Sequence, residues 1–213
     1  MNKALAISIT IIVLSFLVGI YFFNQFPDKL ASHWNAKGEA NGYSSKFFAL
    51  LFLPIIGLTI FLILWFVPRL DPKKQNIEKF KDYYHGFIVI FLLFFFYLQI
   101  LTIVYNSGFK FNMSQLIVPG FAVLFFNLGI LLKNALPNYT IGIRTAWTLS
   151  SDKVWKKTHE VTGNIFKISA LVSLIGIILP DYAVWFILVP ALFSAIFSVI
   201  YSYILFKKHK HKL

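Results

Sequence analysis

The sequence has 213 residues, of which 58% are hydrophobic and only 13% charged, and its mean hydropathy is +0.73. Soluble domains are about 45–50% apolar and about 25% charged, so this chain has too few polar side chains to cover a soluble globule. This composition excludes a soluble enzyme domain, a disordered chain and a collagen-like fibre. The absence of cysteine excludes disulfide frameworks, thiolate zinc sites, iron–sulfur clusters and cysteine nucleophiles.

Six apolar runs are long enough, or nearly long enough, to cross a hydrocarbon core about 30 Å thick. They are Ala4–Phe23, Phe47–Val67, Gly86–Tyr105, Gln115–Leu132, Ile168–Pro180 and Tyr182–Phe206. The fifth run is short. If it is extended back to Ile165, Lys167 would have to extend its ammonium to the cytoplasmic surface. A tight extracellular hairpin at Pro180–Ala183 explains the short link to the sixth run, and a re-entrant segment is the alternative.

Basic residues predict the orientation of these spans. The chain carries a net charge of +12, and the six-span arrangement puts 16 of its 20 Lys and Arg residues on one side and 4 on the other. By the positive-inside rule both termini are then cytoplasmic. The basic excess is therefore mainly topological, although the tail Lys207–Leu213 can also touch anionic headgroups. A nucleic-acid-binding patch is the alternative, but no recognition helix or RNA-stacking module is visible.

The loop between the first two spans, predicted to be extracellular, combines turn residues with aromatic ones. Pro27 ends the first span. The dipeptides Lys37–Gly38 and Asn41–Gly42 predict two turns. We expect a compact loop with Trp34 and Tyr43 at the membrane interface.

The loop between the fourth and fifth spans, predicted to be cytoplasmic, is long and polar. Ser150 or Ser151 is expected to cap a helix, and Asp152 suits the positive end of its dipole. One helical face then carries the residues Val154, Trp155, Thr158, Val161 and Ile165. The pattern predicts a short amphipathic helix that lies on the inner leaflet and leads into the fifth span.

Residues in these two loops resemble the motifs of a known group of membrane proteins. The first loop is similar to the motif of DUF1648 domain proteins, through Pro27, His33, Trp34, Asn35, Gly38, Gly42 and Lys46. The second is similar to the signature of the SdpI immunity protein family, through Asn138, Gly142, Arg144, Thr145, Trp147, Thr148, Trp155 and His159. Ala146 stands where many relatives have proline.

The resemblance implies one membrane domain over residues 1–213, with a DUF1648-like region at 4–67 and an SdpI-like region at 115–206. The expected fold is an all-α, six-span protein of the cell membrane. The implied function is protection of the cell from a secreted antimicrobial peptide toxin. In the founding protein, toxin binding is coupled to capture of a cytoplasmic transcriptional repressor at the membrane.

Several polar and aromatic residues near the ends of the spans have a functional and a structural interpretation. His33 could bind a metal or sense pH, but no second histidine or carboxylate cluster lies nearby, so hydrogen bonding within its loop is favoured. Arg144 could contact a partner or a lipid phosphate, or it could pin its own loop, which is slightly favoured. His85 and His159 are expected beside lipid headgroups, and Trp147 and Trp155 as interfacial anchors.

Polar groups deep in the spans are expected to make interhelical hydrogen bonds. They are Gln99, Asn127, Ser169, Ser173, Ser194 and Ser198. No Asp, Glu or Arg lies in the middle of a span, which argues against the main alternative, a small-molecule or lipid transporter.

Known catalytic motifs are also missing from the sequence. A lipid-modifying enzyme would need Arg144 to hold phosphate and either His159 or Asp152 as its base. We therefore expect no enzyme activity, no catalytic residue, no metal and no cofactor.

Overall fold

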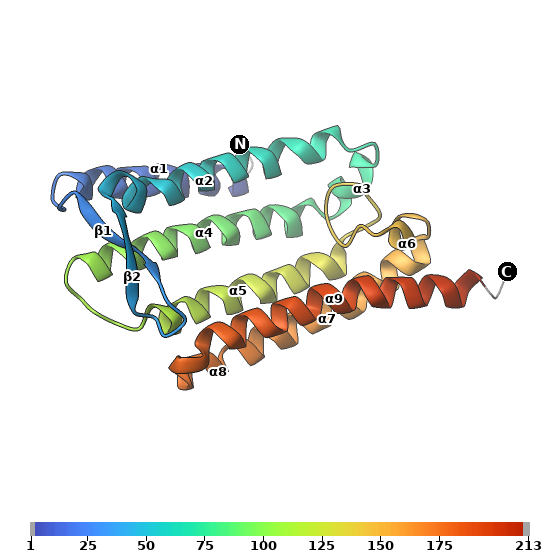
Figure 1. The fold of residues 1–213 in the computed structure, drawn as a ribbon. Coiled ribbons are helices and arrows are strands. Elements are labelled where there is room, and N and C mark those ends of the chain that lie inside the picture. The colour runs from blue at the N-terminus through green and yellow to red at the C-terminus, as the bar shows by residue number, and fades with distance from the viewer. Residues whose placement is uncertain (1–2, 211–213) are drawn as a thin grey trace.

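Six long helices dominate the computed structural model, which describes residues 3–210 (Figure 1). They are α1 (Lys3–Phe23), α2 (Lys46–Phe66), α4 (Lys81–Asn106), α5 (Met113–Asn134), α7 (Asp152–Ser173) and α9 (Ala183–Lys210). Each, alone or with the short helix next to it, is long and apolar enough to cross a membrane, so the prediction of six spans is confirmed. The chain is a multi-pass protein of the cell membrane.

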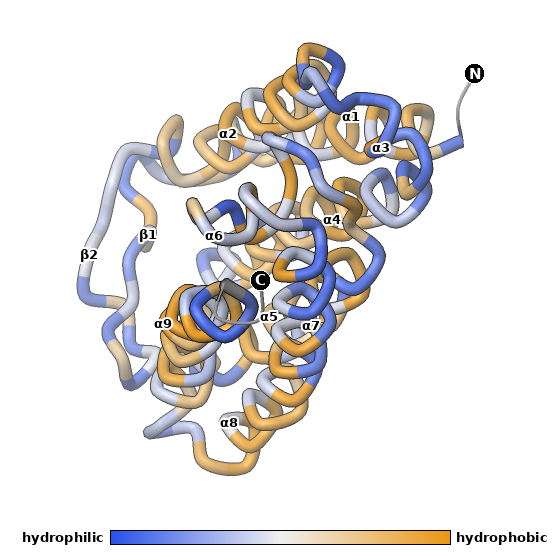
Figure 2. The backbone as a smooth tube through the Cα atoms, turned by 90° about the vertical axis from the view of Figure 1, so that its right-hand side faces the viewer, coloured by the Kyte–Doolittle hydropathy of each residue, from blue (hydrophilic) through white to orange (hydrophobic). Residues whose placement is uncertain are grey.

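The long helices are hydrophobic along most of their length (Figure 2), and they expose apolar side chains on the surface that meets lipid. Leu17, Ile63, Leu171 and Ile196, from four different helices, are all more than half exposed. Proline inside α2, α5 and α9 is tolerated, as is common in spanning helices whose neighbours satisfy the freed carbonyl groups. In a soluble protein such a surface would cause aggregation, whereas here lipid tails cover it.

The bundle consists of two groups of three helices, called the first half (α1, α2 and α4) and the second half (α5, α7 and α9). Within each half the helices pack on one another, and α4 packs along α5 where the halves meet (Figure 1). One buried cluster near the start of α1 combines residues of both halves, among them Ile11, Trp65, Leu131 and Trp155.

The short elements lie at the two ends of the bundle (Figure 1). At one end, β1 (Lys29–Trp34) and β2 (Ala40–Ser45) form an antiparallel hairpin, near α8 (Ile175–Ile178) and η2 (Pro180–Tyr182). The other end carries η1 (Val67–Leu70), α3 (Lys74–Lys79) and α6 (Ala146–Leu149). We call these the hairpin end and the basic end. The predicted basic tail reaches residues 211–213, which lie outside the described residues.

The fifth span differs from the prediction. The amphipathic segment is not a separate helix on the membrane surface but the first turns of α7, which with α8 forms a 27-residue candidate span. Ser151 caps α7, accepting a hydrogen bond from Val154 N at 3.4 Å. Val154, Trp155 and Thr158 are buried because the apolar face packs on helices of the second half rather than on lipid.

The prediction for polar groups in the spans is confirmed in part. Gln99 of α4 donates hydrogen bonds to Ser15 O of α1 and Leu50 O of α2, and Ser169 of α7 meets Ser194 of α9 at 3.0 Å. For Asn127 the prediction is wrong, because its amide donates to Val123 O of its own helix. Ser173 and Ser198 also bond carbonyls of their own helices.

Candidate functional site

The hairpin is closed by a turn that the side chain of Asn35 organises. Its Oδ1 accepts hydrogen bonds from Lys37 N at 2.9 Å and Glu39 N at 3.1 Å. Gly38, at the end of the turn, has φ +77°, a conformation that side-chain-bearing residues rarely adopt. The first predicted turn, at Lys37–Gly38, is therefore confirmed.

The second predicted turn, at Asn41–Gly42, is wrong. Both residues lie within β2, where Gly42 pairs with His33 of β1 beside an irregularity in the register. A Cβ atom on Gly42 would lie only 2.8 Å from the Cβ of His33. The glycine is thus needed for close approach across the sheet and not for chain reversal.

The hairpin is fastened to both halves of the bundle. On the first half, Asn106 of α4 exchanges two hydrogen bonds with the backbone of Ala31, at 2.8 and 3.0 Å. On the second half, the Asn112 amide that caps α5 donates to Lys37 O at 2.8 Å. Gly38 O also accepts from Met113 N at 3.2 Å. The hairpin therefore bridges the halves and is held as a rigid surface.

The remaining residues of the first motif either support the hairpin or face outward. Trp34 packs edge-on against Tyr105 of α4, with ring centroids 5.3 Å apart. Lys46 pairs with Asp28 at 3.1 Å, beside the exposed Pro27 at the bend after α1. His33 Nδ1 lies 2.7 Å from Asn41 Oδ1, in agreement with the favoured interpretation of hydrogen bonding within the loop.

The second motif lies at the opposite end, in the segment 135–151, which we call the motif loop, and in the first turns of α7. Asn138 is 1% exposed and organises the loop. Its Oδ1 accepts from Thr140 N at 2.8 Å and Ile141 N at 2.6 Å, while its Nδ2 donates to Ile141 O at 2.9 Å. When the side-chain oxygen and nitrogen of an asparagine both form hydrogen bonds with the nearby backbone, they hold a loop in one conformation, much as backbone hydrogen bonds hold a helix or a strand.

The motif loop is tied to the first half through Asp71. This carboxylate is 5% exposed and accepts hydrogen bonds from Lys73 N, Tyr139 N and Thr140 Oγ1, at 2.7, 2.8 and 2.6 Å. A buried carboxylate is tolerated when several donors satisfy its oxygens. Like the hairpin at the other end, this contact joins the two halves of the bundle.

His159 is the centre of the second motif. Its ring is 1% exposed and stacks on Trp155 at 4.1 Å, so the expectation that it lies beside lipid headgroups is wrong. Nε2 accepts from Ile143 N at 2.9 Å, and Nδ1 lies 2.9 Å from Trp155 O, which identifies Nδ1 as the protonated nitrogen. Gly142, at φ +114°, allows this approach, since a Cβ there would lie 2.4 Å from Nε2.

Trp155 is also buried, at 1% exposure, so it is not the interfacial anchor that we expected. Its indole Nε1 donates to Ala135 O at 2.8 Å, at the end of α5. The helical spacing of these residues indicated a buried face, but the sequence could not show that protein rather than lipid covers it.

The other motif residues complete the loop. Thr145 and Thr148 form a capping box for α6, and Thr145 Oγ1 contacts Ser202 Oγ of α9 at 3.0 Å. Trp147 packs on Tyr203 of α9, with ring centroids 5.1 Å apart. Arg144 is exposed and donates to Tyr139 O at 2.7 Å, so it does pin its own loop.

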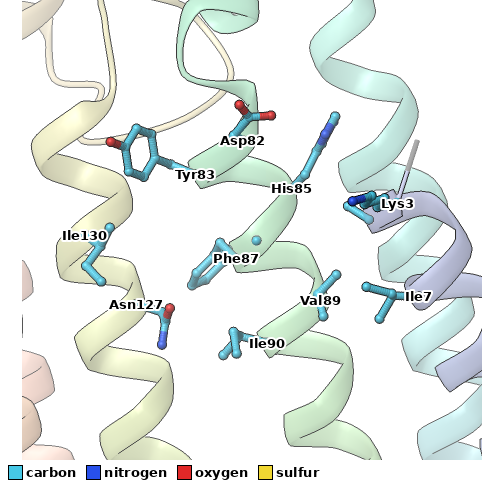
Figure 3. Close-up of a pocket in the computed structure, with 12 residues that line it drawn as sticks. Lys3, Ile7, Asp82, Tyr83, His85, Phe87, Val89, Ile90, Asn127 and Ile130 are labelled. Carbon is cyan, nitrogen blue, oxygen red and sulfur yellow. The ribbon is translucent and has the colours of Figure 1, made fainter.

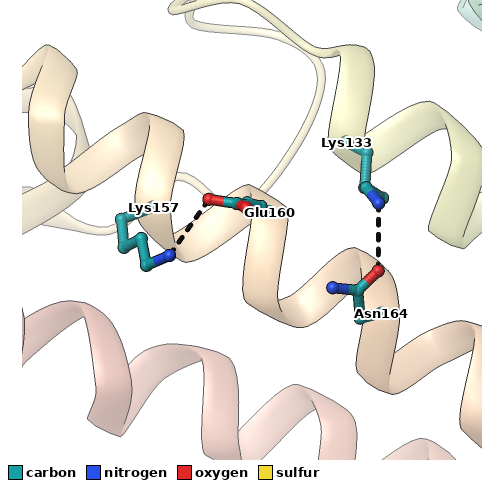
Figure 4. A network of polar contacts seen from close by, with 4 residues as sticks. All are labelled: Lys133, Lys157, Glu160 and Asn164. Carbon is teal, nitrogen blue, oxygen red and sulfur yellow. Dashed lines mark hydrogen bonds and ion pairs between the residues drawn. The ribbon is translucent and has the colours of Figure 1, made fainter.

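Below the motif loop, α5 and α7 approach closely through two glycines. A Cβ on Gly129 would lie 2.5 Å from Gly163 O, and one on Gly163 would lie 2.7 Å from Gly129 O. Polar contacts flank this crossing at the basic end, where Lys133 bonds Asn164 Oδ1 at 3.1 Å, and an ion pair lies along α7 (Figure 4). Small residues at such a crossing let spanning helices pack backbone to backbone.

A pocket of about 550 Å³ opens between the starts of α1 and α4 and the second part of α5 (Figure 3). Phe87 and Ile90 of α4 line it together with Asn127 and Ile130 of α5, and Lys3 and His85 lie at its edge. Neither motif contributes a residue to this pocket. The motifs therefore form two separate surfaces, one at each end of the bundle.

Some residues that position the motifs were not singled out from the sequence. Asn106 and Asn112 hold the hairpin, and Asp71 holds the motif loop. All three stand in connecting segments or at helix ends. The one available signal was that Asn and Asp are common helix-capping and turn residues. That signal does not reveal a partner about 70 residues away in the chain.

Comparison with known proteins finds two separate matches, one around each motif. Residues 10–58 match a domain of unknown function, DUF1648, and residues 135–202 match the SdpI/YfhL protein family. The chain is 24% identical over 203 residues to the immunity protein SdpI of Bacillus subtilis (strain 168), a similarity that covers 95% of each chain. No solved structure matches the chain.

The first matched region contains most of α1, the hairpin and the first part of α2, and the second contains the motif loop, α7 and most of α9. Both matched regions occur in this one chain. The similarity to the Bacillus subtilis immunity protein extends over nearly the whole length of the chain. The chain is therefore similar to the SdpI/YfhL protein family over residues 135–202 and to DUF1648 over residues 10–58.

Proposed function

We propose that this chain is an immunity protein that protects the cell membrane from a secreted antimicrobial peptide toxin. The observation that carries the proposal is the similarity to the Bacillus subtilis immunity protein over 95% of both chains, which includes both motif regions. A shared domain alone would support less, because one fold can serve many functions.

The hairpin supports binding of a peptide at one face of the membrane. Its outward side carries His33, Asn41 and Tyr43, and Tyr43 is 66% exposed although it is a large aromatic residue. Hydrogen bonds to both halves hold the strands, so a ligand would meet a preformed surface and little ordering entropy would be lost on binding. Aromatic side chains on rigid elements are frequent energetic centres of interfaces.

We further propose that the motif loop presents a surface to a soluble transcriptional repressor. Arg144, Trp147 and Leu149 are each partly or fully exposed on this loop, and Arg and Trp are common in binding interfaces. A toxin could change the affinity for a repressor only by binding one arrangement of the protein better than another. The contacts that join the two halves, made by Asp71 and by the hairpin through Asn112, are where such an arrangement would change.

We propose binding, not catalysis, as the mode of action. His159 is one of the two candidates for a general base, but both of its ring nitrogens are engaged within the protein and its ring is 1% exposed. A base must reach the proton that it removes, directly or through one water molecule. Asp152, the other candidate for a general base, is an exposed residue at the start of α7.

The test is survival of a toxin-sensitive bacterium that expresses the chain, measured against SdpI-type peptide toxins. Protection should appear with the unaltered chain, should fall with Tyr43→Ala, and should be retained with Arg144→Ala. Repressor capture in the presence of toxin, measured as the fraction of the repressor in the membrane pellet, should fall with both variants, because it depends on toxin binding as well as on the motif loop. Immunoblots must show equal membrane levels. Unchanged killing by every toxin tried would contradict the immunity proposal.

A further inference from the structure

A second and larger cavity lies at the basic end, beside the pocket of Figure 3, with which it shares His85. Its volume is about 970 Å³, and the ends of α1, α2 and α4 enclose it together with η1 and α3. Leu5, Trp65 and Ile77 give it apolar walls. The family motifs contribute no residue to this cavity, so an inference about it does not rest on the proposed immunity function.

The charged residues that line the cavity are mostly basic. They are Arg69, Lys74, Lys79 and Lys81, against the single carboxylate of Glu78. Lys81 forms an ion pair with Glu78. Within residues 3–210, no carboxylate lies at ion-pair distance from Arg69, Lys74 or Lys79. The cavity therefore carries a positive charge that the described part of the chain does not neutralise.

Arg69 is held in place at the edge of the cavity. Its guanidinium carbon lies 5.3 Å from the centroid of the Trp65 ring and 5.0 Å from that of Phe66. Stacking on aromatic rings orients the guanidinium plane and leaves its N–H donors available for an oxygen-rich anion. Phosphate suits these donors well, because they can bind two of its oxygens at once.

The surroundings of Arg69 indicate a ligand that also carries hydrocarbon. Phe66, Val67 and Leu70 expose 54%, 42% and 83% of their surface next to it, at the point where the apolar stretch of α2 ends. The cavity thus lies where hydrocarbon gives way to headgroups, with apolar and basic walls side by side. Basic pockets between spanning helices are known to hold anionic lipid headgroups.

From this arrangement we propose that the cavity binds an anionic glycerophospholipid. The phosphate lies among Arg69, Lys74 and Lys79, and the acyl chains run along Phe66 and Leu70 into the bilayer. A free phosphate ion would satisfy the same donors, but it would leave the apolar walls uncovered.

The test is native mass spectrometry of the full chain purified in detergent, with phosphatidylglycerol or phosphatidylcholine added at equal concentrations. We compare the unaltered chain with the triple variant Arg69→Gln, Lys74→Gln, Lys79→Gln. A matched control, Lys153→Gln, Lys156→Gln, Lys207→Gln, removes the same charge from exposed positions outside the cavity. Circular dichroism verifies that all three proteins are folded.

The unaltered chain and the control should retain phosphatidylglycerol in preference to phosphatidylcholine. The cavity variant should bind phosphatidylglycerol about a hundredfold more weakly, since each of the three basic residues near anionic lipid contributes roughly fivefold. Equal weakening in both variants, or no preference for phosphatidylglycerol in the unaltered chain, would overturn the proposal. Displacement of the lipid by inorganic phosphate at constant ionic strength would overturn it in favour of a soluble anion.

Discussion

The side chain of Asn106, at the end of α4, pairs with the backbone of Ala31 as a neighbouring strand would. Its Oδ1 accepts from Ala31 N at 2.8 Å, and its Nδ2 donates to Ala31 O at 3.0 Å. Ala31 is 2% exposed, so water cannot replace these hydrogen bonds. One amide thereby fixes the β1 strand of the hairpin onto the first half of the bundle.

Replacing Asn106 with alanine should loosen the hairpin. Two buried backbone groups would lose their partners, which costs about 1–3 kcal/mol per group. We expect a lower unfolding temperature in detergent and faster amide hydrogen exchange at Ala31 and its neighbours in β1. Ser107→Ala is the control, because the Ser107 hydroxyl bonds only Ile103 O of the same helix. Equal exchange rates in the two variants would contradict the bridging role of Asn106.

Replacing Asp71 with alanine should separate the motif loop from the first half. Its carboxylate is buried and accepts three hydrogen bonds, two of them from Tyr139 and Thr140 of the motif loop. We expect a loss of several kcal/mol of stability, measured by thermal unfolding. In a double-mutant cycle, Thr140→Val should cost clearly less in the Asp71→Ala background than alone. Additive effects would refute the contact, and Asp181→Ala, at an exposed position, should change little.

Replacing Gly142 with alanine should damage the motif loop for two reasons. The residue has φ +114°, and the new Cβ would lie 2.4 Å from His159 Nε2. Backbone strain of this kind costs about 1–3 kcal/mol, to which the clash with the buried imidazole adds. Gly108→Ala, with φ +104° and nothing within 4 Å, should show the strain alone.

The matched control for these glycines is Gly86→Ala, in the exposed part of α4, where nothing lies within 4 Å. Alanine favours helix, so this variant should be neutral or more stable. Unfolding temperatures should therefore rank Gly86→Ala highest, then Gly108→Ala, then Gly142→Ala. Any other order would contradict the geometry of the motif loop.

Replacing Gly163 with alanine should force α5 and α7 apart, because the new Cβ would lie 2.7 Å from Gly129 O, a backbone atom that cannot rotate away. We expect destabilisation of about 1–3 kcal/mol, as for other overpacked sites. Gly57→Ala, whose Cβ would make only ordinary contacts at 3.8 Å, is the comparison in thermal unfolding. Similar unfolding temperatures for the two variants would show that the helices do not cross at these glycines.

The spans were predictable because lipid imposes a strong and local requirement, a run of about 20 apolar residues. The role of Ser151 as a helix cap could also be predicted from the sequence, since capping depends on residues three positions apart. The hairpin could not be predicted, because β1 and β2 contain few β-branched or aromatic residues and are held on the bundle by Asn106 and Asn112, far along the chain. The burial of His159 likewise depends on Ile143 and Gly142 folding over it.

We propose that the two family motifs lie on opposite faces of the membrane, with the hairpin outside. Because the chain has no cysteine, a single Lys37→Cys or Lys153→Cys variant reports one position only. Both positions are exposed, one in the hairpin turn and one at the start of α7. A membrane-impermeant maleimide should label Lys37→Cys in intact cells, and Lys153→Cys only after the membrane is opened. Labelling of both variants in intact cells, or labelling of Lys153→Cys alone, would show that the hairpin and the motif loop do not have this orientation.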